Sequence, residues 1–509
     1  MSSKTGVCNT SAFKTPKKKI IRNSQPSSEA VVVGRRSNLG EALKAKGVDQ
    51  KLPSKYDHGR TIPHFEVRLS KSNPFRLFYI GPQPNSVTLQ DILSKDHISA
   101  LLIINYIVDV KWIRDQLSSA SQRTDDITIV ASVRADLDGS MPHPQDPEGL
   151  KFFNVRSMPY KFGTHHAKMI IIKYDHGGVR VVVTTANMKV DDWNLYVNGL
   201  WVSPLLSRSE DGSGNPDSAT NFRKDSVLFL RTYEMFSHDQ PFRLITRWME
   251  EISILNCVDV NVYFVASVPG KHQTDLEDWG HCKLRKILIS HNKLCHTTAS
   301  QSHVVAQCSA IGSLGGRDPG WLSSDFLRST GASGSLCNFH LIYPTAQYVQ
   351  NFIYSAGSGA STQADNQTCL SYSRAVHAEQ SWLTKYLCKW VPADSIKMPA
   401  IPHLKTYASV DSEMRRANWF LLTSANMSQA AWGSNSLDQS TSFIKSFEAG
   451  VLFIPECCTD SESFSLVDSE DADQHFLQLP YKLLLRYLPK DEPFLTNSPP
   501  DFYKKSSLG

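Results

Sequence analysis

A pattern of polar residues that occurs twice constrains this chain more than any other feature. The first copy contains "HHAKM" followed by "VVVTTANMKVDDW", and the second contains "PHLKTY" followed by "FLLTSANMSQAAW". His166 and Lys168 are two residues apart, as are His403 and Lys405. A single H-x-K is common and usually carries no function, but two copies with matching continuations indicate a shared role.

The continuation of each copy is also repeated. Each H-x-K is followed by an asparagine, Asn187 or Asn426, and six residues after that by a tryptophan. Each copy then returns to an apolar strand led by a glycine, Gly199 or Gly450. The copies flank 205–221, a stretch rich in Gly, Ser, Asp and Pro. The pattern therefore predicts a duplicated protein in which each half donates one H-x-K…N set.

The apolar runs between these motifs are short and rich in β-branched residues, which is typical of strands. Longer amphipathic stretches predict helices at 108–117, 220–236 and 378–391. Strands mixed with helices indicate an α/β architecture. The acidic stretch 456–473 predicts a solvated loop. The predicted strands are 101–106, 126–133, 169–174, 179–185, 261–268, 338–344, 418–424 and 449–455.

The basic character of the chain is confined to its N-terminal tail. Residues 1–60 carry a net charge of +9 against +5 for the whole chain, so the rest carries −4. This composition predicts a disordered tail, in which 14–22 is either a nuclear localisation signal, a nucleic-acid-binding arm or a solvated charge cluster. Order is expected to begin near Phe65. The predicted domains are a basic tail at 1–60, a first half at 61–205, a linker at 206–219 and a second half at 220–509.

Several classes of protein are disfavoured by composition. The longest apolar stretch, 98–110, is shorter than the roughly 18 residues that a membrane-spanning helix needs. The first twenty residues lack the apolar core of a secretory signal. The ten cysteines are scattered without zinc-ligand spacing, which favours a reducing compartment. We therefore expect no membrane association, no metal and no cofactor.

The repeated residue types suit the chemistry of a phosphodiester. Along a strand, the His and Lys of H-x-K point to the same face, because side chains repeat with period two. Two copies meeting across an interface would bring together two imidazoles, two ammonium groups and two carboxamides. One imidazole could attack phosphorus and the other could protonate the leaving oxygen. The lysines and asparagines could hold the non-bridging oxygens without a metal ion.

Several longer motifs surround the two H-x-K pairs. They are "FGTHHAKM", "QCSAIGSLGG", "PHLKTY", "TSANMSQAAWG" and "KSFEAGVLF". On these motifs, from about residue 74 to 497, the chain resembles the phospholipase D superfamily and within it the tyrosyl-DNA phosphodiesterases. The common superfamily pattern places an Asp five residues after the Lys; here Lys173 and Val410 stand there, as in a family that uses Asn instead. The resemblance implies two pseudo-symmetric phospholipase D-like α-β-α sandwich halves with the active site at their interface.

The resemblance also implies roles for the repeated residues. His166 matches the nucleophile that forms a phosphohistidine–DNA intermediate. His403 matches the acid that protonates the departing tyrosine and the base that then activates water. Lys168, Lys405, Asn187 and Asn426 match the groups that grip the phosphate. Glu448 matches an acid that hydrogen-bonds one of the two catalytic histidines, and the sequence leaves open which one.

Further residues match positions along the DNA groove. Phe162 matches an aromatic that packs on the terminal base, and Tyr106 matches a residue near the groove that could equally be structural. Ser309 and Ser313 are expected to bind upstream phosphates, although the family often has a second Ser where this chain has Ala310. Asn198 occupies the position equivalent to Glu448, where the family is expected to have Gln. The predicted substrate-binding residues are Phe162, Ser309, Ser313, Asn198, Ser428 and Tyr106.

Four further residues receive other interpretations. His165 has no counterpart in the second copy, where Pro402 stands, so it is expected to be a hydrogen-bonded structural histidine. Asp192 is a candidate for a supporting contact. Trp193 and Trp432 are expected to pack in the core.

The function implied by the resemblance is hydrolysis of the 3′-phosphotyrosyl bond between topoisomerase I and DNA, in the nucleus. The implied partners are DNA 3′ ends, single-stranded or in nicked duplex, that carry a covalently attached topoisomerase I peptide; a monomer is expected. One alternative is another member of the superfamily, a nuclease or a phosphatidyl transferase, which Asn in place of Asp disfavours. A second alternative is an inactive module that binds DNA ends, but both H-x-K pairs are intact.

Overall fold

The computed structural model describes most of the chain between residues 75 and 496. The undescribed segments inside this range are 82–85, 95, 123, 125, 135–148, 156–157, 209–215, 237–241, 295–301, 317–319, 333–337, 356–367, 395–399, 468–475 and 484. The predicted tail, the motif at 14–22, the start of order near Phe65 and part of the predicted linker therefore lie outside the described residues. All described residues belong to one compact unit.

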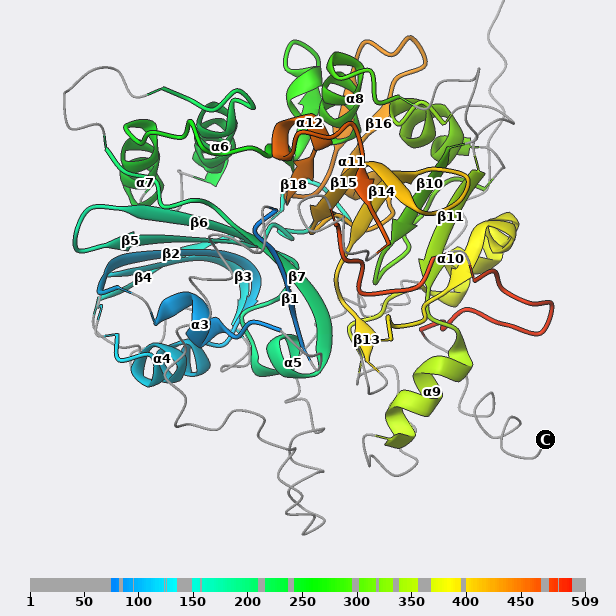
Figure 1. Ribbon diagram of the computed structural model, residues 1–509, viewed down its shortest axis with the longest axis horizontal. Coiled ribbons are helices and arrows are strands. Elements are labelled where there is room, and N and C mark those ends of the chain that lie inside the picture. The colour runs from blue at the N-terminus through cyan, green and yellow to red at the C-terminus, as the bar shows by residue number, and fades with distance from the viewer. Residues whose placement is uncertain are drawn as a thin grey trace, which may run out of the picture. The chain divides into compact units, whose positions relative to one another are not determined.

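The first mixed sheet has the order β1-β7-β6-β5-β2-β3-β4 (Figure 1). Its strands β2, β3 and β4 are parallel, and β5, β6, β7 and β1 join them antiparallel. The strands are β1 (Leu77–Ile80), β2 (Ile98–Val108), β3 (Ile127–Arg134), β4 (Leu150–Asn154), β5 (Met169–Tyr174), β6 (Val179–Thr184) and β7 (Tyr196–Val202).

The second mixed sheet repeats the first strand for strand. Its order is β12-β11-β10-β14-β15-β18-β8, with parallel pairing from β12 to β10 and antiparallel pairing from β10 to β8. The duplication read from the motifs therefore corresponds to two similar mixed α/β sheets. The strands are β8 (Tyr263–Ser267), β10 (His303–Gln307), β11 (Asn338–Tyr343), β12 (Leu387–Lys389), β14 (Thr406–Val410), β15 (Arg416–Thr423) and β18 (Glu448–Phe453).

The remaining strands are short. A small sheet has the order β16-β17-β9, while β13 pairs with β7 of the first sheet and β19 with β15 of the second. These strands are β9 (Gly270–His272), β13 (Ile401–Pro402), β16 (Ser434–Asn435), β17 (Ser442–Ile444) and β19 (Phe464–Ser465). The β19 strand and helix α12 (Pro455–Cys458) occupy parts of the stretch 456–473 that was expected to be a loop, and residues 468–473 lie outside the described part of the chain.

Alternating side chains of the first sheet bury its two faces against different helices (Figure 1). Leu101 and Ile103 lie in the cluster with α3 (Leu89–Leu93) and α4 (Val110–Ser119). Leu102 and Ile104 lie instead in the cluster with α6 (Phe222–Arg231) and α7 (Arg243–Ser253). Such alternation is what period-two side-chain direction produces in a sheet covered on both faces. Helix α4 begins where the Asp109 carboxylate accepts the Trp112 backbone N–H at 2.8 Å.

Helices α6 and α7 pack on the first sheet, although sequence placed residues 220–236 in the second half. The Arg247 guanidinium donates to both carboxylate oxygens of Asp126 at 2.8 Å, and Lys173 donates to Glu251 at 2.6 Å. Helix α6 also reaches the second sheet, since the Phe222 and Phe264 ring centroids are 6.0 Å apart. The helix therefore ties the two halves together.

Most of the other helical segments lie in the second half, whereas α5 connects β6 and β7 of the first sheet and η1 continues α6. The predicted helix 378–391 is wrong in its second part, because 387–389 pair with β11 as strand β12 and the chain before them forms two short helices. The helical segments are α5 (Val190–Asn194), η1 (Thr232–Phe236), η2 (Leu276–Asp278), α8 (Gly280–Ser290), η3 (Leu322–Leu327), α9 (Ala346–Ser355), α10 (Arg374–Glu379), η5 (Ser381–Tyr386) and α11 (Gln429–Trp432).

Each half extends its H-x-K segment onto the start of a strand in the other half. The His166 backbone N–H donates to the Phe447 carbonyl at 2.9 Å. In the reciprocal contact, the His403 N–H donates to the Val197 carbonyl at 2.9 Å. Val197 and Phe447 stand directly before Asn198 and Glu448, so the two contacts are equivalent in the duplication.

Register corrects one equivalence inferred from the motifs. Thr184 pairs with Leu200, whereas Thr423 pairs with Gly450, so the two strand-leading glycines are not counterparts. Gly199 instead lies against the other half, because a Cβ there would be 2.7 Å from Leu422 Cδ1. Close packing between the halves, rather than the repeat, therefore requires this glycine.

Phe447 lies at the centre of an aromatic cluster and is fully buried. Its ring stacks on Tyr233 at 4.9 Å and meets His165 at 5.6 Å. We expect Phe447→Ala to lower the free energy of unfolding by about 3–5 kcal/mol, because it leaves a cavity between the halves. Phe447→Leu, the matched control, should cost less than about 1.5 kcal/mol. Guanidinium denaturation of both variants measures the difference. Equal losses of unfolding free energy would contradict the inference that the volume of the Phe447 ring stabilises the contact between the halves.

Candidate active site

The two H-x-K segments lie just before their strands rather than within them. Residues 166–168 precede β5, and 403–405 precede β14. The hydrogen-bonded ladder nevertheless continues to each lysine, whose carbonyl accepts the N–H of Thr184 or Thr423 at 3.1 Å. In both copies the lysine ammonium donates back to the carbonyl of the histidine two residues earlier. The backbone therefore holds each His and Lys in the same relative arrangement.

Each of these histidines meets an acid from the opposite half. The His166 Nδ1 lies 2.9 Å from Glu448 Oε2, and the His403 Nδ1 lies 2.6 Å from Asp192 Oδ2. A carboxylate only accepts hydrogen bonds, so the hydrogen of the neutral His166 imidazole is held on Nδ1. The approach of Asp192 favours the same tautomer in His403, although the two groups are not aligned as a hydrogen bond. The lone pair on Nε2 is then free in both rings, which is the state that a nucleophile or base requires.

Burial keeps both imidazoles neutral at physiological pH. Removal from water lowers the pKa of His166 to about 4, with Glu448 opposing and Lys168 adding to the effect. Burial and the charge of Lys405 lower the pKa of His403 to about 3, although Asp192 opposes them. Burial would raise the pKa of Asp192, but its contacts with His403 and Lys189 lower it, so this carboxyl stays ionised.

The two lysine side chains are fully buried and close enough to repel one another. Burial, followed by the charge of Lys405, lowers the pKa of Lys168 to about 7. Burial lowers the pKa of Lys405 to about 8. Two buried ammonium groups beside neutral imidazoles favour an anionic ligand, whose charge would offset their desolvation.

The two asparagines follow strands β6 and β15 and are fixed in different ways. Asn426 Oδ1 accepts from the backbone N–H groups of Ser309 and Ala310 at 3.2 and 2.9 Å. Its amide NH₂ is thereby left to donate elsewhere. The backbone N–H of Asn187 donates to Asp192 Oδ2 at 2.8 Å, which joins this asparagine to the acid beside His403.

Behind the asparagines, a hydroxyl in each half supports the next strand. Ser424 Oγ donates to Glu448 at 2.5 Å and accepts the Ala449 N–H. At the equivalent place, Thr185 Oγ1 donates to Asn198 Oδ1 at 2.8 Å. The Asn198 amide in turn donates to the Asp192 carbonyl at 2.7 Å and is completely buried. This placement gives Asn198 contacts within its own half and brings neither catalytic histidine to it.

His165 is a structural histidine, as its lack of a counterpart predicted. It is fully buried, and its Nε2 lies 2.7 Å from the Tyr233 hydroxyl. Burial and the charge of Lys168 lower its pKa to about 3. The imidazole therefore remains neutral on the side of the segment away from His166.

Of the two predicted groove aromatics, Tyr106 lies beside the histidine–lysine cluster. The Tyr106 ring centroid is 5.8 Å from that of His166, and the Lys168 ammonium lies 6.0 Å from the Tyr106 ring. Phe162 has φ +67° and is 75% exposed. A left-handed conformation in a bulky residue costs on the order of 1–3 kcal/mol and clusters at functional sites. The chain therefore bears strain to hold this ring in solvent.

The predicted serines take three different positions. Ser309 is buried and its hydroxyl donates to Asn426 at 3.3 Å, whereas Ser313 is exposed. Ser428 caps α11, since its hydroxyl accepts the Ala431 N–H at 3.1 Å. Gly312 packs against it, because a Cβ at Gly312 would lie 2.6 Å from Ser428 Cβ. The loop and the cap therefore form one continuous wall beside Asn426.

Asp192 is the functional residue that sequence reasoning underestimated. Asp192 stands five residues after Asn187, and the residue five after Asn426 in the second copy is Ala431. The duplication therefore offers no second acid at this position. Its relation to His403 depends on how the halves meet. The sequence signal was only the acidic pair Asp191–Asp192 directly before Trp193.

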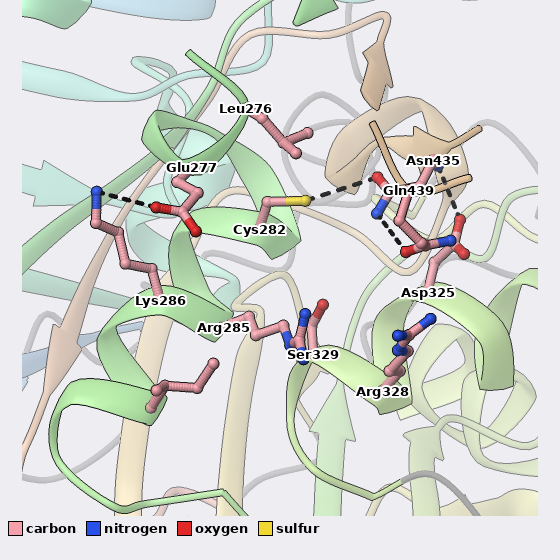
Figure 2. Close-up of a pocket in the computed structure, with 11 residues that line it drawn as sticks. Leu276, Glu277, Cys282, Arg285, Lys286, Asp325, Arg328, Ser329, Asn435 and Gln439 are labelled. Carbon is pink, nitrogen blue, oxygen red and sulfur yellow. Dashed lines mark hydrogen bonds and ion pairs between the residues drawn. The ribbon is translucent and has the colours of Figure 1, made fainter. Parts of the chain in front are cut away.

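Other features lie apart from this centre. A pocket of about 80 Å³ is lined by α8, η3 and the β16–β17 connection, and includes Cys282, Arg285 and Arg328 (Figure 2). Within the described ranges, no group of three or more His, Cys, Asp or Glu side chains could hold a metal ion. In the same part of the chain, no helix is long and apolar enough to cross a bilayer.

Comparison with known proteins identifies this arrangement. The family model for tyrosyl-DNA phosphodiesterase matches residues 79–487. Tyrosyl-DNA phosphodiesterase 1 of Drosophila melanogaster is 31% identical over 497 residues, which cover 90% of this chain and 80% of that protein. The Arabidopsis thaliana protein of the same name is 30% identical over 403 residues, which cover 75% of this chain and 62% of that protein.

Solved structures agree on the fold. The crystal structure of the yeast tyrosyl-DNA phosphodiesterase aligns with a TM-score of 0.63 at 20% identity, covering 82% of this chain and all of that one. At this identity the likeness supports the two-sheet architecture alone. The family model and the relatives extend over most of the sequence, including both H-x-K…N sets. The chain therefore belongs to the tyrosyl-DNA phosphodiesterase family and is a tyrosyl-DNA phosphodiesterase.

Proposed function

We propose that the bond cleaved joins a DNA 3′-phosphate to a tyrosine of topoisomerase I, and that cleavage passes through a covalent phosphohistidine. The observation that carries this proposal is the pair of imidazoles, each with its Nδ1 beside a carboxylate of the opposite half. A pair with both Nε2 atoms free can supply a nucleophile and a separate acid–base group.

In the first step His166 Nε2 attacks phosphorus and the bond to the tyrosine oxygen breaks. The electron pair of that bond leaves on the oxygen, which takes the Nε2 proton of His403; this ring enters the step as an imidazolium, because the bound anionic phosphate and the ionised Asp192 favour its charged form. Because the free phenol has a pKa of about 10, this oxygen needs only modest acid assistance. Glu448 supports the attack by orienting the ring and stabilising the positive charge that develops on it.

In the second step His403 removes a proton from water, whose oxygen attacks phosphorus. The bond from phosphorus to His166 breaks, and the free imidazole and a DNA 3′-phosphate are formed. The ionised Asp192 stabilises the His403 imidazolium in both steps. Lys168, Lys405, Asn187 and Asn426 hold the non-bridging oxygens, on which charge accumulates.

The substrate-binding residues extend this site toward the DNA. Tyr106 lies beside His166 and Phe162 precedes His166 by four residues, while Ser309, Ser313 and Ser428 belong to the loop and cap next to Asn426. We propose that this groove receives single-stranded or nicked 3′ ends, and that Asn198 acts by holding the strand behind the site. We further propose a nuclear, monomeric enzyme, supported by its family and the basic 14–22 motif.

The proposal predicts release of a 3′-phosphate from an oligonucleotide bearing 3′-phosphotyrosine, in the presence of EDTA. His166→Ala should abolish turnover, since no nucleophile remains. His403→Ala should accumulate a protein–DNA adduct, because attack survives while water activation is lost. Gel electrophoresis under denaturing conditions separates adduct from product. Normal turnover by His403→Ala would refute the acid–base assignment.

The acids should differ in the step that they support. Glu448→Gln should slow adduct formation, and Asp192→Asn should slow adduct hydrolysis, each by roughly 10- to 100-fold as for other groups that orient a reacting side chain. Rapid-quench measurements of adduct against time distinguish the two. Slowing of the same step by both variants would show that the acids do not divide their roles between the histidines.

The pKa values predict a bell-shaped dependence of kcat/KM on pH. Activity should fall as pH drops toward about 4, because His166 becomes protonated and loses its lone pair. It should fall again above about 7 to 8, as Lys168 and Lys405 lose the charge that binds phosphate. Lys168→Arg should move the alkaline limb upward, because a guanidinium stays charged. An unmoved limb would exclude Lys168 as its origin.

A further inference from the structure

Beside Phe162 lies a group of aromatic and basic side chains that the catalytic steps do not use. The Tyr160 and Phe443 ring centroids are 4.7 Å apart, edge to face, and both rings are half-buried. Lys445 lies 5.8 Å above the Phe443 ring, and Lys161 lies 5.0 Å above that of Phe162. On the neighbouring strand, the exposed Lys271 pairs with Phe443 in register.

We propose that Tyr160, Phe443 and the three lysines, Lys161, Lys271 and Lys445, form a binding surface for the single-stranded DNA that leads to the scissile phosphate. We call it the aromatic–lysine surface. This inference rests on the proposed function and extends it to nucleotides beyond the reacting one. Bases would stack on the exposed parts of the rings, and the lysines would neutralise backbone phosphates.

The aromatic–lysine surface is joined to the catalytic centre through the backbone. A Cβ at Gly163 would lie 2.2 Å from the Lys445 carbonyl oxygen, so the two segments touch directly. The Thr164 N–H donates to Ser446 Oγ at 3.1 Å, next to the pairing of His166 with Phe447. A DNA strand whose 3′-phosphate reaches His166 would therefore pass over this surface if it extended away from the site on the side of Phe162.

The surface also continues into the phosphate-binding wall. The backbone N–H groups of Lys445 and Ser446 both donate to the Ala430 carbonyl at 3.1 Å. Ala430 lies in helix α11, which Ser428 caps. The predicted phosphate contacts and the aromatic–lysine surface therefore lie on adjoining segments.

Among the described residues, no acidic side chain forms an ion pair with Lys161, Lys271 or Lys445. The pocket of Figure 2 differs in this respect, because the Asp325 carboxylate lines it and Lys286 is paired with Glu277 at 3.3 Å. A polyanion is better matched by the aromatic–lysine surface, and Arg285 in the pocket provides a control for general charge effects.

The test compares two 3′-phosphotyrosyl substrates, a single nucleoside and an oligonucleotide of about 15 nucleotides, near the upper limit for one such site. Phe443→Ala and Lys445→Gln should raise KM for the long substrate by roughly 5- to 100-fold, as expected for loss of one stacked base or phosphate contact. Both variants should cleave the single nucleoside normally. Phe443→Trp should retain binding, because it keeps a stacking ring.

The dependence of KM on salt concentration distinguishes a direct phosphate contact at this surface from a general effect of positive charge. Lys445→Gln should reduce the slope of log KM against log salt for the long substrate by about 0.7, the value for one phosphate contact in single strands. Arg285→Gln should leave that slope unchanged. Equal changes for both variants, or unchanged KM in Lys445→Gln and Phe443→Ala, would overturn the proposal.

Two other outcomes are decisive. Loss of activity on the single nucleoside would show that Phe443 and Lys445 act through the catalytic residues instead. Losses that grow with the length of the attached peptide, rather than of the DNA, would assign the surface to the protein part of the adduct. Failure of the unmodified enzyme on both substrates would refute the proposed function itself, which keeps the two hypotheses distinct.

Discussion

The catalytic centre depends on a reciprocal exchange of backbone hydrogen bonds between the two halves. The backbone N–H of His166 donates to the Phe447 carbonyl, and that of His403 donates to the Val197 carbonyl. Each histidine is thereby anchored to the opposite half, directly beside Glu448 in one case and Asn198 in the other. Hydrogen bonds between backbone groups in a buried setting fix position closely, because an unmade bond there costs the full desolvation of its partners. The imidazoles, lysines and asparagines are then brought together by the same contacts that join the halves.

The duplication is broken where the chemistry requires two different histidines. In the second half the acid, Glu448, stands at the start of a strand, and in the first half that position is Asn198. The first half instead supplies Asp192 from helix α5, at the position equivalent to Ala431. Each histidine therefore has one carboxylate, but the two approach from different elements. A symmetric scaffold can in this way give one imidazole the environment of a nucleophile and the other that of an acid and base.

Local sequence patterns predicted most of the strands and helices, but they could not predict the contacts between the two halves. Strand β5 was predicted with its observed bounds, because a run of β-branched residues between a motif and a turn is decided locally. The sequence 378–391 was read as one helix, whereas pairing with β11 makes its end a strand. Likewise, the partner of Glu448 and the contact of Asp192 with His403 depend on packing between distant segments. The H-x-K…N residues themselves could be chosen because they occur twice.

The anchoring of His166 has a consequence for the synthesis of the chain. Its partner Glu448 is 282 residues further along, so a ribosome must add these residues before the His166 imidazole can be oriented. Contacts between residues so far apart in sequence form late, because the chain must lose the entropy of closing a long loop before the contact contributes any stabilisation. The nascent first half can fold its own sheet while its reactive imidazole lacks both partner and anchor. The environment proposed for this imidazole is therefore assembled only after residue 448 has been synthesised.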